Sequence, residues 1–133
     1  MIKHARVLLP ALGALALLAA PVAQAKPVRA AATITVTAGK PAEFNFKLSS
    51  KTFAHGTVTF NVTNSGALPH DFKICSKPTT TKANACTGKS TGLISTGASK
   101  KLTVTFAKAG SYEYLCTVTG HAAGGMKGLM KVT

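Results

Sequence analysis

Short stretches in which apolar and polar residues alternate constrain the fold of this chain more than any other feature. The clearest are 33–37, 57–63, 101–106 and 111–116, and turn residues separate the stretches at intervals of roughly ten positions. A period of two is typical of strands that bury one face. No segment after residue 25 has a convincing helical pattern. The sequence therefore predicts an all-β fold, an antiparallel sandwich or barrel of about seven to eight strands.

The alternation also predicts which side chains fill the core. A large apolar side chain that becomes fully buried contributes about 1.5–3 kcal/mol. Segments 49–56 and 76–97 have no clear alternation and are interpreted as connections. We expect one of the two tyrosines to form a hydrogen-bonded corner. The predicted inward rows contain Ile34 and Val36; Phe44, Phe46 and Leu48; Val58, Phe60 and Val62; Phe72 and Ile74; Leu102, Val104 and Phe106; and Tyr112 and Tyr114.

Residues 1–25 have the features of a secretory signal peptide. A basic start precedes an almost wholly apolar run, which ends at Ala23-Gln24-Ala25. The apolar run is too short and too interrupted by proline and glycine for a stop-transfer anchor. We expect a mobile tail over 26–32 and one domain over 33–133. The mature protein is expected to be exported to the periplasm or the extracellular space, with no membrane span.

The chain has three cysteines, Cys75, Cys86 and Cys116. An odd number in an exported protein requires a separate role for one thiol. The simplest partition pairs Cys75 with Cys86 in a disulfide and leaves Cys116 for a metal. The alternative, two unpaired thiols at 75 and 86, does not suit an oxidising compartment.

Four side chains are candidates for a soft transition-metal site. Cys116, His121 and Met126 follow one another at spacings of five in a glycine-rich stretch after a predicted strand, and His70 ends an earlier loop. Thiolate suits Cu(I) and imidazole suits Cu(II). A Cys-His-His set with a distant axial methionine is the blue-copper arrangement. The four candidates therefore match the donor types of a blue-copper site.

Each candidate also has an ordinary structural interpretation: an inert buried thiol, surface histidines or a core methionine. The joint spacing favours the metal site over these separate alternatives. Met130 is a rival axial ligand, but its alternation with Val132 predicts a core position. His55 lies in a turn far from both motifs and is expected at the surface.

Two segments, 64–72 and 110–128, resemble the copper-binding motifs of cupredoxins of the plastocyanin/azurin class. The Cys-x4-His-x4-Met spacing is most similar to the auracyanin and rusticyanin branch. The resemblance implies a Greek-key β-sandwich and a role in one-electron transfer. It also implies that the copper ligands are His70, Cys116, His121 and Met126.

The sequence departs from the family pattern at two places. Asp71 occupies a position where the family often has asparagine, whose side chain braces the loop after the cysteine. We therefore expect Asp71 to contact Thr117 and its charge to influence the reduction potential. The insertion between Cys75 and Cys86 is not general to the family, and its role stays open.

Charge and loop composition suggest the kind of partner. Two of the 16 basic residues precede residue 26, so the formal charge of +13 becomes +11 in the mature chain. Such a field suits an acidic redox partner, although a merely solvated basic surface is equally compatible. The lysines are scattered and no nucleic-acid motif is present, which argues against nucleic acid. The small apolar rim of Leu68, Pro69, Ala122 and Ala123 suits a transient docking surface around His121 on a monomer.

Two other classes of function compete with electron transfer. A copper protein for storage, delivery or resistance would have a similar site, but its copper would be exchangeable. An enzyme is not expected, because the chain offers no second metal set and no acid–base pair for substrate chemistry.

Overall fold

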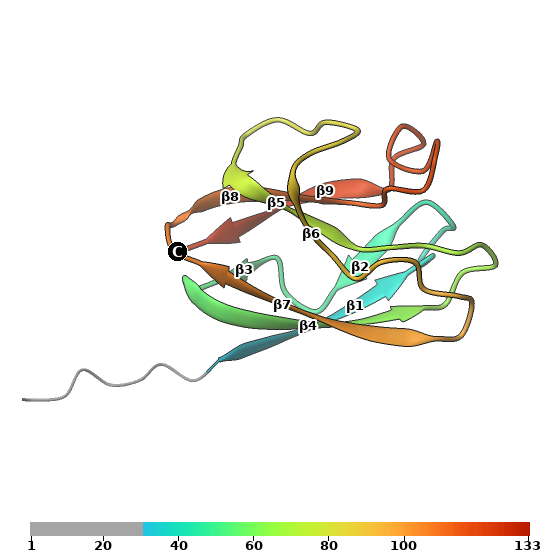
Figure 1. Ribbon diagram of the computed structural model, residues 1–133, viewed down its shortest axis with the longest axis horizontal. Coiled ribbons are helices and arrows are strands. Elements are labelled where there is room, and N and C mark those ends of the chain that lie inside the picture. The colour runs from blue at the N-terminus through green and yellow to red at the C-terminus, as the bar shows by residue number, and fades with distance from the viewer. Residues whose placement is uncertain (1–30) are drawn as a thin grey trace, which may run out of the picture.

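The computed structural model describes residues 31–133, so the predicted signal peptide and most of the predicted tail lie outside the described residues. The described part folds as two stacked sheets without helices (Figure 1). One sheet has the order β2-β1-β4-β7 and the other β3-β9-β8-β5-β6. The sequence left sandwich and barrel open, and the structure is a sandwich. Its strands are β1 (Ala32–Ala38), β2 (Phe46–Leu48), β3 (Thr52–Phe53), β4 (Gly56–Asn64), β5 (Lys73–Pro78), β6 (Gly88–Ser90), β7 (Ser99–Phe106), β8 (Gly110–Leu115) and β9 (Lys127–Val132).

The sheets are mixed rather than purely antiparallel, so that part of the prediction was wrong. β1 pairs with β4 in parallel, and β3 pairs with β9 in parallel. The physical reason lies in the chain path, because the chain crosses to the second sheet through β3 before it returns as β4. The remaining pairs between strands are antiparallel. β3 and β6 lie within segments that the sequence indicated as connections; at two and three residues they are too short to show alternation.

The predicted inward rows form the core between the sheets, with Phe60 and Phe72 at its centre, ring centroids 5.6 Å apart. Leu48 and Val104 are only half-buried. Phe44 contradicts the prediction, because its side chain is 38% exposed. It precedes β2 rather than lying within it, so the alternation of that strand does not govern its direction. Tyr112 forms the expected corner, since its hydroxyl donates to the Lys108 carbonyl at 3.0 Å.

The outer face of β8 is buried as well. The predicted disulfide between Cys75 and Cys86 is present, with the two Cα atoms 5.6 Å apart. Around it, Leu115 and Ala122 form a second small apolar cluster. Segment 76–97 thereby covers a face that alternation alone would leave to solvent, and Glu113 is buried there.

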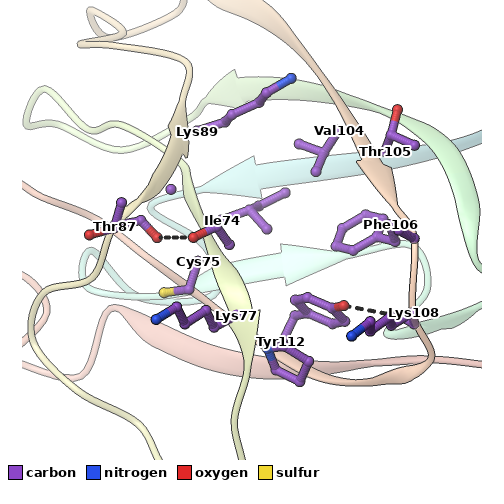
Figure 2. Close-up of a pocket in the computed structure, with 14 residues that line it drawn as sticks. Ile74, Cys75, Lys77, Thr87, Lys89, Val104, Thr105, Phe106, Lys108 and Tyr112 are labelled. Carbon is purple, nitrogen blue, oxygen red and sulfur yellow. Dashed lines mark hydrogen bonds between the residues drawn. The ribbon is translucent and has the colours of Figure 1, made fainter.

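A cavity of about 570 Å³ lies between β5, β6 and β7 (Figure 2). Its lining includes Ile74, Val104, Phe106 and Tyr112, together with lysines from three segments. None of the four candidate metal ligands lines it.

The segments that follow β1, β4 and β8 meet at one end of the sandwich (Figure 1). They correspond to residues 39–45, 65–72 and 116–126. Side chains from distant parts of the sequence can therefore converge at this end. Within residues 31–133, no helix has the length and apolar character needed to cross a membrane.

Candidate metal centre

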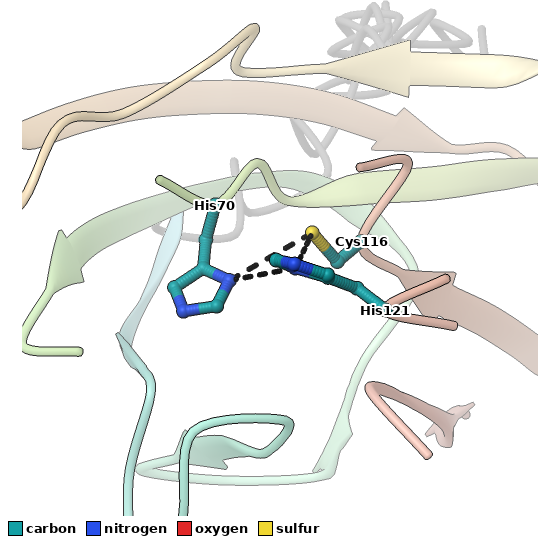
Figure 3. A group of neighbouring side chains, drawn as sticks. All are labelled: His70, Cys116 and His121. Atoms are coloured by element: carbon teal, nitrogen blue, oxygen red, sulfur yellow. Dashed lines mark hydrogen bonds between the residues drawn. The ribbon is translucent and has the colours of Figure 1, made fainter. Parts of the chain in front are cut away.

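His70, Cys116 and His121 converge at this end of the sandwich (Figure 3). The two Nδ1 atoms lie 3.1 Å apart. The Cys116 Sγ atom lies 3.5 Å from Nδ1 of His121 and 4.0 Å from Nδ1 of His70. All three residues are buried, with exposures of 0% for His70 and Cys116 and 7% for His121. Three donor atoms of the predicted types are thus gathered in one water-poor space.

His70 is held by contacts on both sides of its backbone. It forms an isolated β-bridge with Ile94, with N···O distances of 3.2 and 2.7 Å. Upstream, the buried amide of Asn64 donates to the carbonyls of Leu68 and Ile94 and accepts from the backbone N–H of Gly66. The end of the long 76–97 segment therefore fixes the first histidine, a contact that the sequence pattern did not reveal.

The second half of the site is a single closed loop. The N–H of Cys116 donates to the Met126 carbonyl at 3.0 Å, and the N–H of Met126 donates to the His121 carbonyl at 2.9 Å. Turn hydrogen bonds close the segment between them, where Gly120 and Gly125 adopt positive φ angles of 83° and 111°. L side chains rarely adopt such angles, which explains glycine at these positions. Met126, at the end of this loop, is fully buried.

Burial sets the protonation of the donors. Desolvation raises the pKa of the Cys116 thiol to about 11. Desolvation also lowers the pKa of His121, and the neighbouring His70 lowers it further. Neutral imidazoles offer a lone pair, and a bound cation reverses the cost of a buried thiolate.

The donor set fits a copper ion. Metal bonds of about 2.0 Å to imidazole and about 2.3 Å to thiolate place the donors of one ion about 3–4 Å apart. The observed separations of 3.1, 3.5 and 4.0 Å lie in that range. One thiolate and two imidazoles are also the ligands of a blue-copper site.

Asp71 braces the cysteine side of the centre. Its backbone N–H points to Cys116 Sγ at 3.5 Å. Its carboxylate accepts hydrogen bonds from the Thr117 N–H and, at 2.7 Å, from the Thr117 hydroxyl. The expected contact between Asp71 and Thr117 is therefore present. Ser90 of β6 adds a third donor at 2.8 Å, so the insertion after Cys75 reaches the site as well.

Glu43 is a site residue that sequence reasoning missed. Its Oε1 atom lies 2.8 Å from Nε2 of His70, and its carboxylate accepts the backbone N–H groups of Ala67 and Leu68. Those two N–H groups, followed by His70, hold the pKa of Glu43 at about 2, so it is ionised at neutral pH. The available signal was composition, because only three acidic residues occur in the chain.

The four residues of the predicted docking rim differ in their exposure. Leu68 is 42% exposed, and Pro69 and Ala123 are also exposed. Ala122 is 4% exposed and packs into the cluster around the disulfide, so it does not belong to the rim. The ring of Phe44, which is exposed, lies 4.9 Å from that of His121.

Met130 and His55 lie where the sequence predicted. Met130 is 1% exposed and belongs to the main core, where β9 places it opposite Tyr112. His55 is exposed, and its Nδ1 atom lies 3.0 Å from the C-terminal Thr133 carbonyl. Neither residue is therefore grouped with the donors.

A β-sandwich that gathers a buried cysteine and two histidines in the loops at one end, with a buried methionine closing the same loop, is a cupredoxin, the class of type 1 or blue copper electron-transfer proteins. The sequence matches the copper-binding proteins of the plastocyanin/azurin family over residues 32–133. The chain belongs to that family, and copper is its cofactor.

Solved structures with the same fold include auracyanins and rusticyanin. Auracyanin from the photosynthetic bacterium Roseiflexus castenholzii is 24% identical, with 79% of this chain and 99% of that chain covered and a TM-score of 0.59. Auracyanin A from Chloroflexus aurantiacus, described as a "blue" copper protein, is 23% identical, with 76% of this chain and 98% of that chain covered and a TM-score of 0.60. Rusticyanin from Thiobacillus ferrooxidans is 25% identical over 76% of both chains, with a TM-score of 0.52. Comparison with curated protein sequences gave no significant match.

Proposed function

We propose that His70, Cys116, His121 and Met126 hold one copper ion and that the protein passes single electrons between redox partners outside the cytoplasm. The observation that carries this proposal is the convergence of three buried donors, whose ligand atoms all lie within 4.8 Å of one another. When bound, copper supplies the one-electron couple between its two oxidation states. The protein's own residues supply everything else.

Backbone hydrogen bonds hold the segments that carry the proposed donors. They are the bridge between His70 and Ile94 and the bonds that close the loop from Cys116 to Met126. Sites held by packed elements keep their geometry when charge changes. Little rearrangement should therefore accompany electron gain or loss.

His121 is the proposed exit for the electron. It is the most exposed of the three converging donors, and Phe44, Leu68 and Ala123 form an apolar rim near it. A small apolar contact suits a short-lived complex between redox proteins. The net charge of +11 after removal of the first 25 residues favours an acidic partner, with association that weakens as salt rises.

Copper delivery or storage is the competing function. A copper-delivery protein must release its metal, whereas the proposed donors here are buried in segments that backbone hydrogen bonds hold closed. That burial favours retained copper and hence the carrier. Slow copper loss to a competing chelator together with a reversible voltammetric wave would support the carrier. Rapid loss to the chelator would instead support delivery.

Export is proposed from two observations. The chain begins with a basic and apolar stretch that ends in Ala-Gln-Ala, and the folded domain contains a disulfide. Structural disulfides persist in oxidising compartments such as the periplasm.

Spectroscopy of the copper-loaded protein tests the proposed centre. We expect an intense visible band from thiolate-to-copper charge transfer and a narrow copper hyperfine splitting in electron paramagnetic resonance. Cys116→Ser should abolish both. A colourless Cu(II) protein with ordinary hyperfine splitting would contradict the electron-carrier function.

A further inference from the structure

We propose that Glu43 is a positioning residue for the copper site, which fixes the tautomer of His70 and lowers the reduction potential through its negative charge. The proposal rests on the proposed function, since it assumes that His70 holds copper. It assigns a role to one of only three acidic side chains in a strongly basic protein.

The contacts of Glu43 join its loop to the loop that carries His70. Oε1 lies 2.8 Å from His70 Nε2 and 2.9 Å from the backbone nitrogen of Leu68. Oε2 lies 2.9 Å from the backbone nitrogen of Ala67. Three donors thus surround one carboxylate, and the only side chain among them is His70.

These contacts determine which nitrogen of His70 can bind metal. An ionised carboxylate can only accept hydrogen bonds, so Nε2 of His70 must carry the proton. The neutral ring then presents its lone pair at Nδ1, the atom that faces Nδ1 of His121 at 3.1 Å and Sγ of Cys116 at 4.0 Å. The partner of the outer ring nitrogen commonly sets tautomer and orientation in metal sites.

Two glycines leave room for the Glu43 carboxylate beside the His70 imidazole. A Cβ atom on Gly66 would lie 2.5 Å from Oε1 of Glu43 and 2.8 Å from Nε2 of His70. Gly66 in turn packs against Gly39, where a Cβ atom would overlap the Gly66 backbone. An alanine at position 66 would displace Glu43 or His70. An alanine at position 39 would displace the backbone of Gly66, which lies between them and the Gly39 loop.

A fixed negative charge beside a metal ligand also affects the reduction potential of the Cu(II)/Cu(I) couple. It favours the higher charge of Cu(II) over that of Cu(I), and a more basic imidazole acts in the same direction. Removal of the charge should therefore raise the reduction potential. A purely structural role, as a staple for residues 67 and 68, predicts loss of stability without a specific effect on copper.

The test compares Glu43→Gln with Glu113→Gln in the copper-loaded protein. Both substitutions replace a carboxylate by an amide of the same size, but Glu113 lies beside the Cys75–Cys86 disulfide and forms no hydrogen bond to a candidate ligand. We expect Glu43→Gln to keep the blue band, to raise the reduction potential more than the control does, and to weaken copper binding about 10–100-fold. Nitrogen NMR of the Cu(I) protein should show a slowly exchanging Nε2 proton on His70 that exchanges faster in Glu43→Gln.

Equal potentials, equal copper affinity and an unchanged His70 proton in the two variants would overturn the proposal. That result in a blue wild-type protein would leave the proposed function intact. A wild-type protein without a blue band would instead contradict the proposed function, and the His70 tautomer could still be measured in the copper-free protein.

Discussion

The hydroxyl of Thr117 donates to the carboxylate of Asp71 at 2.7 Å, and the backbone N–H of Thr117 donates to the same carboxylate. Asp71 follows one proposed ligand, His70, and Thr117 follows another, Cys116. The two halves of the centre are therefore tied together by the residues just after their ligands. Because Asp71 contributes a carboxylate, this link affects the charge near the copper site as well as the geometry of the site.

Asp71→Asn should raise the reduction potential while the blue band persists. Asparagine keeps the shape, but it removes the charge, and its single carbonyl oxygen cannot accept all the hydrogen bonds from Thr117 and Ser90. Voltammetry of the copper-loaded variant measures the change. Glu113→Gln serves again as the charge control. A potential equal to or below that of the wild type would contradict a role for the Asp71 charge.

Ala123→Glu should slow electron transfer without altering the visible spectrum. Ala123 is exposed next to His121 and its neighbour Ala122, so a carboxylate there adds charge and bulk to the proposed docking rim. Ala109→Glu is a matched control, because Ala109 is also exposed but lies in the turn at the opposite end of the sandwich. Stopped-flow rates with an acidic redox protein should fall severalfold for Ala123→Glu alone. Equal rates for the two variants would exclude this rim as the contact.

The double variant Cys75→Ser/Cys86→Ser should lose stability but remain blue. The bridge closes a sequence separation of 11, and loops of that length contribute roughly 3 kcal/mol in the chain-entropy description. Urea unfolding of the copper-free proteins measures the difference. A lost blue band would show that the covered face of β8 is needed for the site itself.

Glu113→Gln should raise stability at neutral pH. Burial raises the pKa of Glu113 above its ordinary value of 4.5, and Oε1 has no hydrogen-bond partner among the described residues. A carboxyl with a raised pKa in the folded state contributes stability that is complete below the ordinary value and declines as the pH rises through the folded value. The amide cannot ionise, so the variant should not show that decline.

Free energies of unfolding at about pH 4 and about pH 7.5 test this expectation. The variant and the wild type should differ more at the higher pH, with the variant more stable. A difference that is the same at both pH values would mean that Glu113 is not stabilised in its neutral form.

Much of the core could be predicted because alternation is a local property. The inward positions of β1, β4 and β7 follow from residues two apart, and only Val104 among them is half-buried. Phe44 escaped the pattern because it lies in a loop, where the backbone direction depends on what the loop packs against. The burial of Glu113 depended on segment 76–97, whose path no periodicity records.

The sequence by itself determined the chemistry of this protein. Cys116, His121 and Met126 lie in one short loop, and their spacing predicted the donor types and the metal before any fold was known. The sequence also predicted His70 as a ligand, but the tertiary structure decided how His70 lies against that loop and placed Glu43 beside it, across 27 residues. The physical reason is that a loop's ends are fixed by the strands that it joins. Which loops meet at one end of a sandwich, and which carboxylate faces which imidazole, is settled only when the two sheets pack.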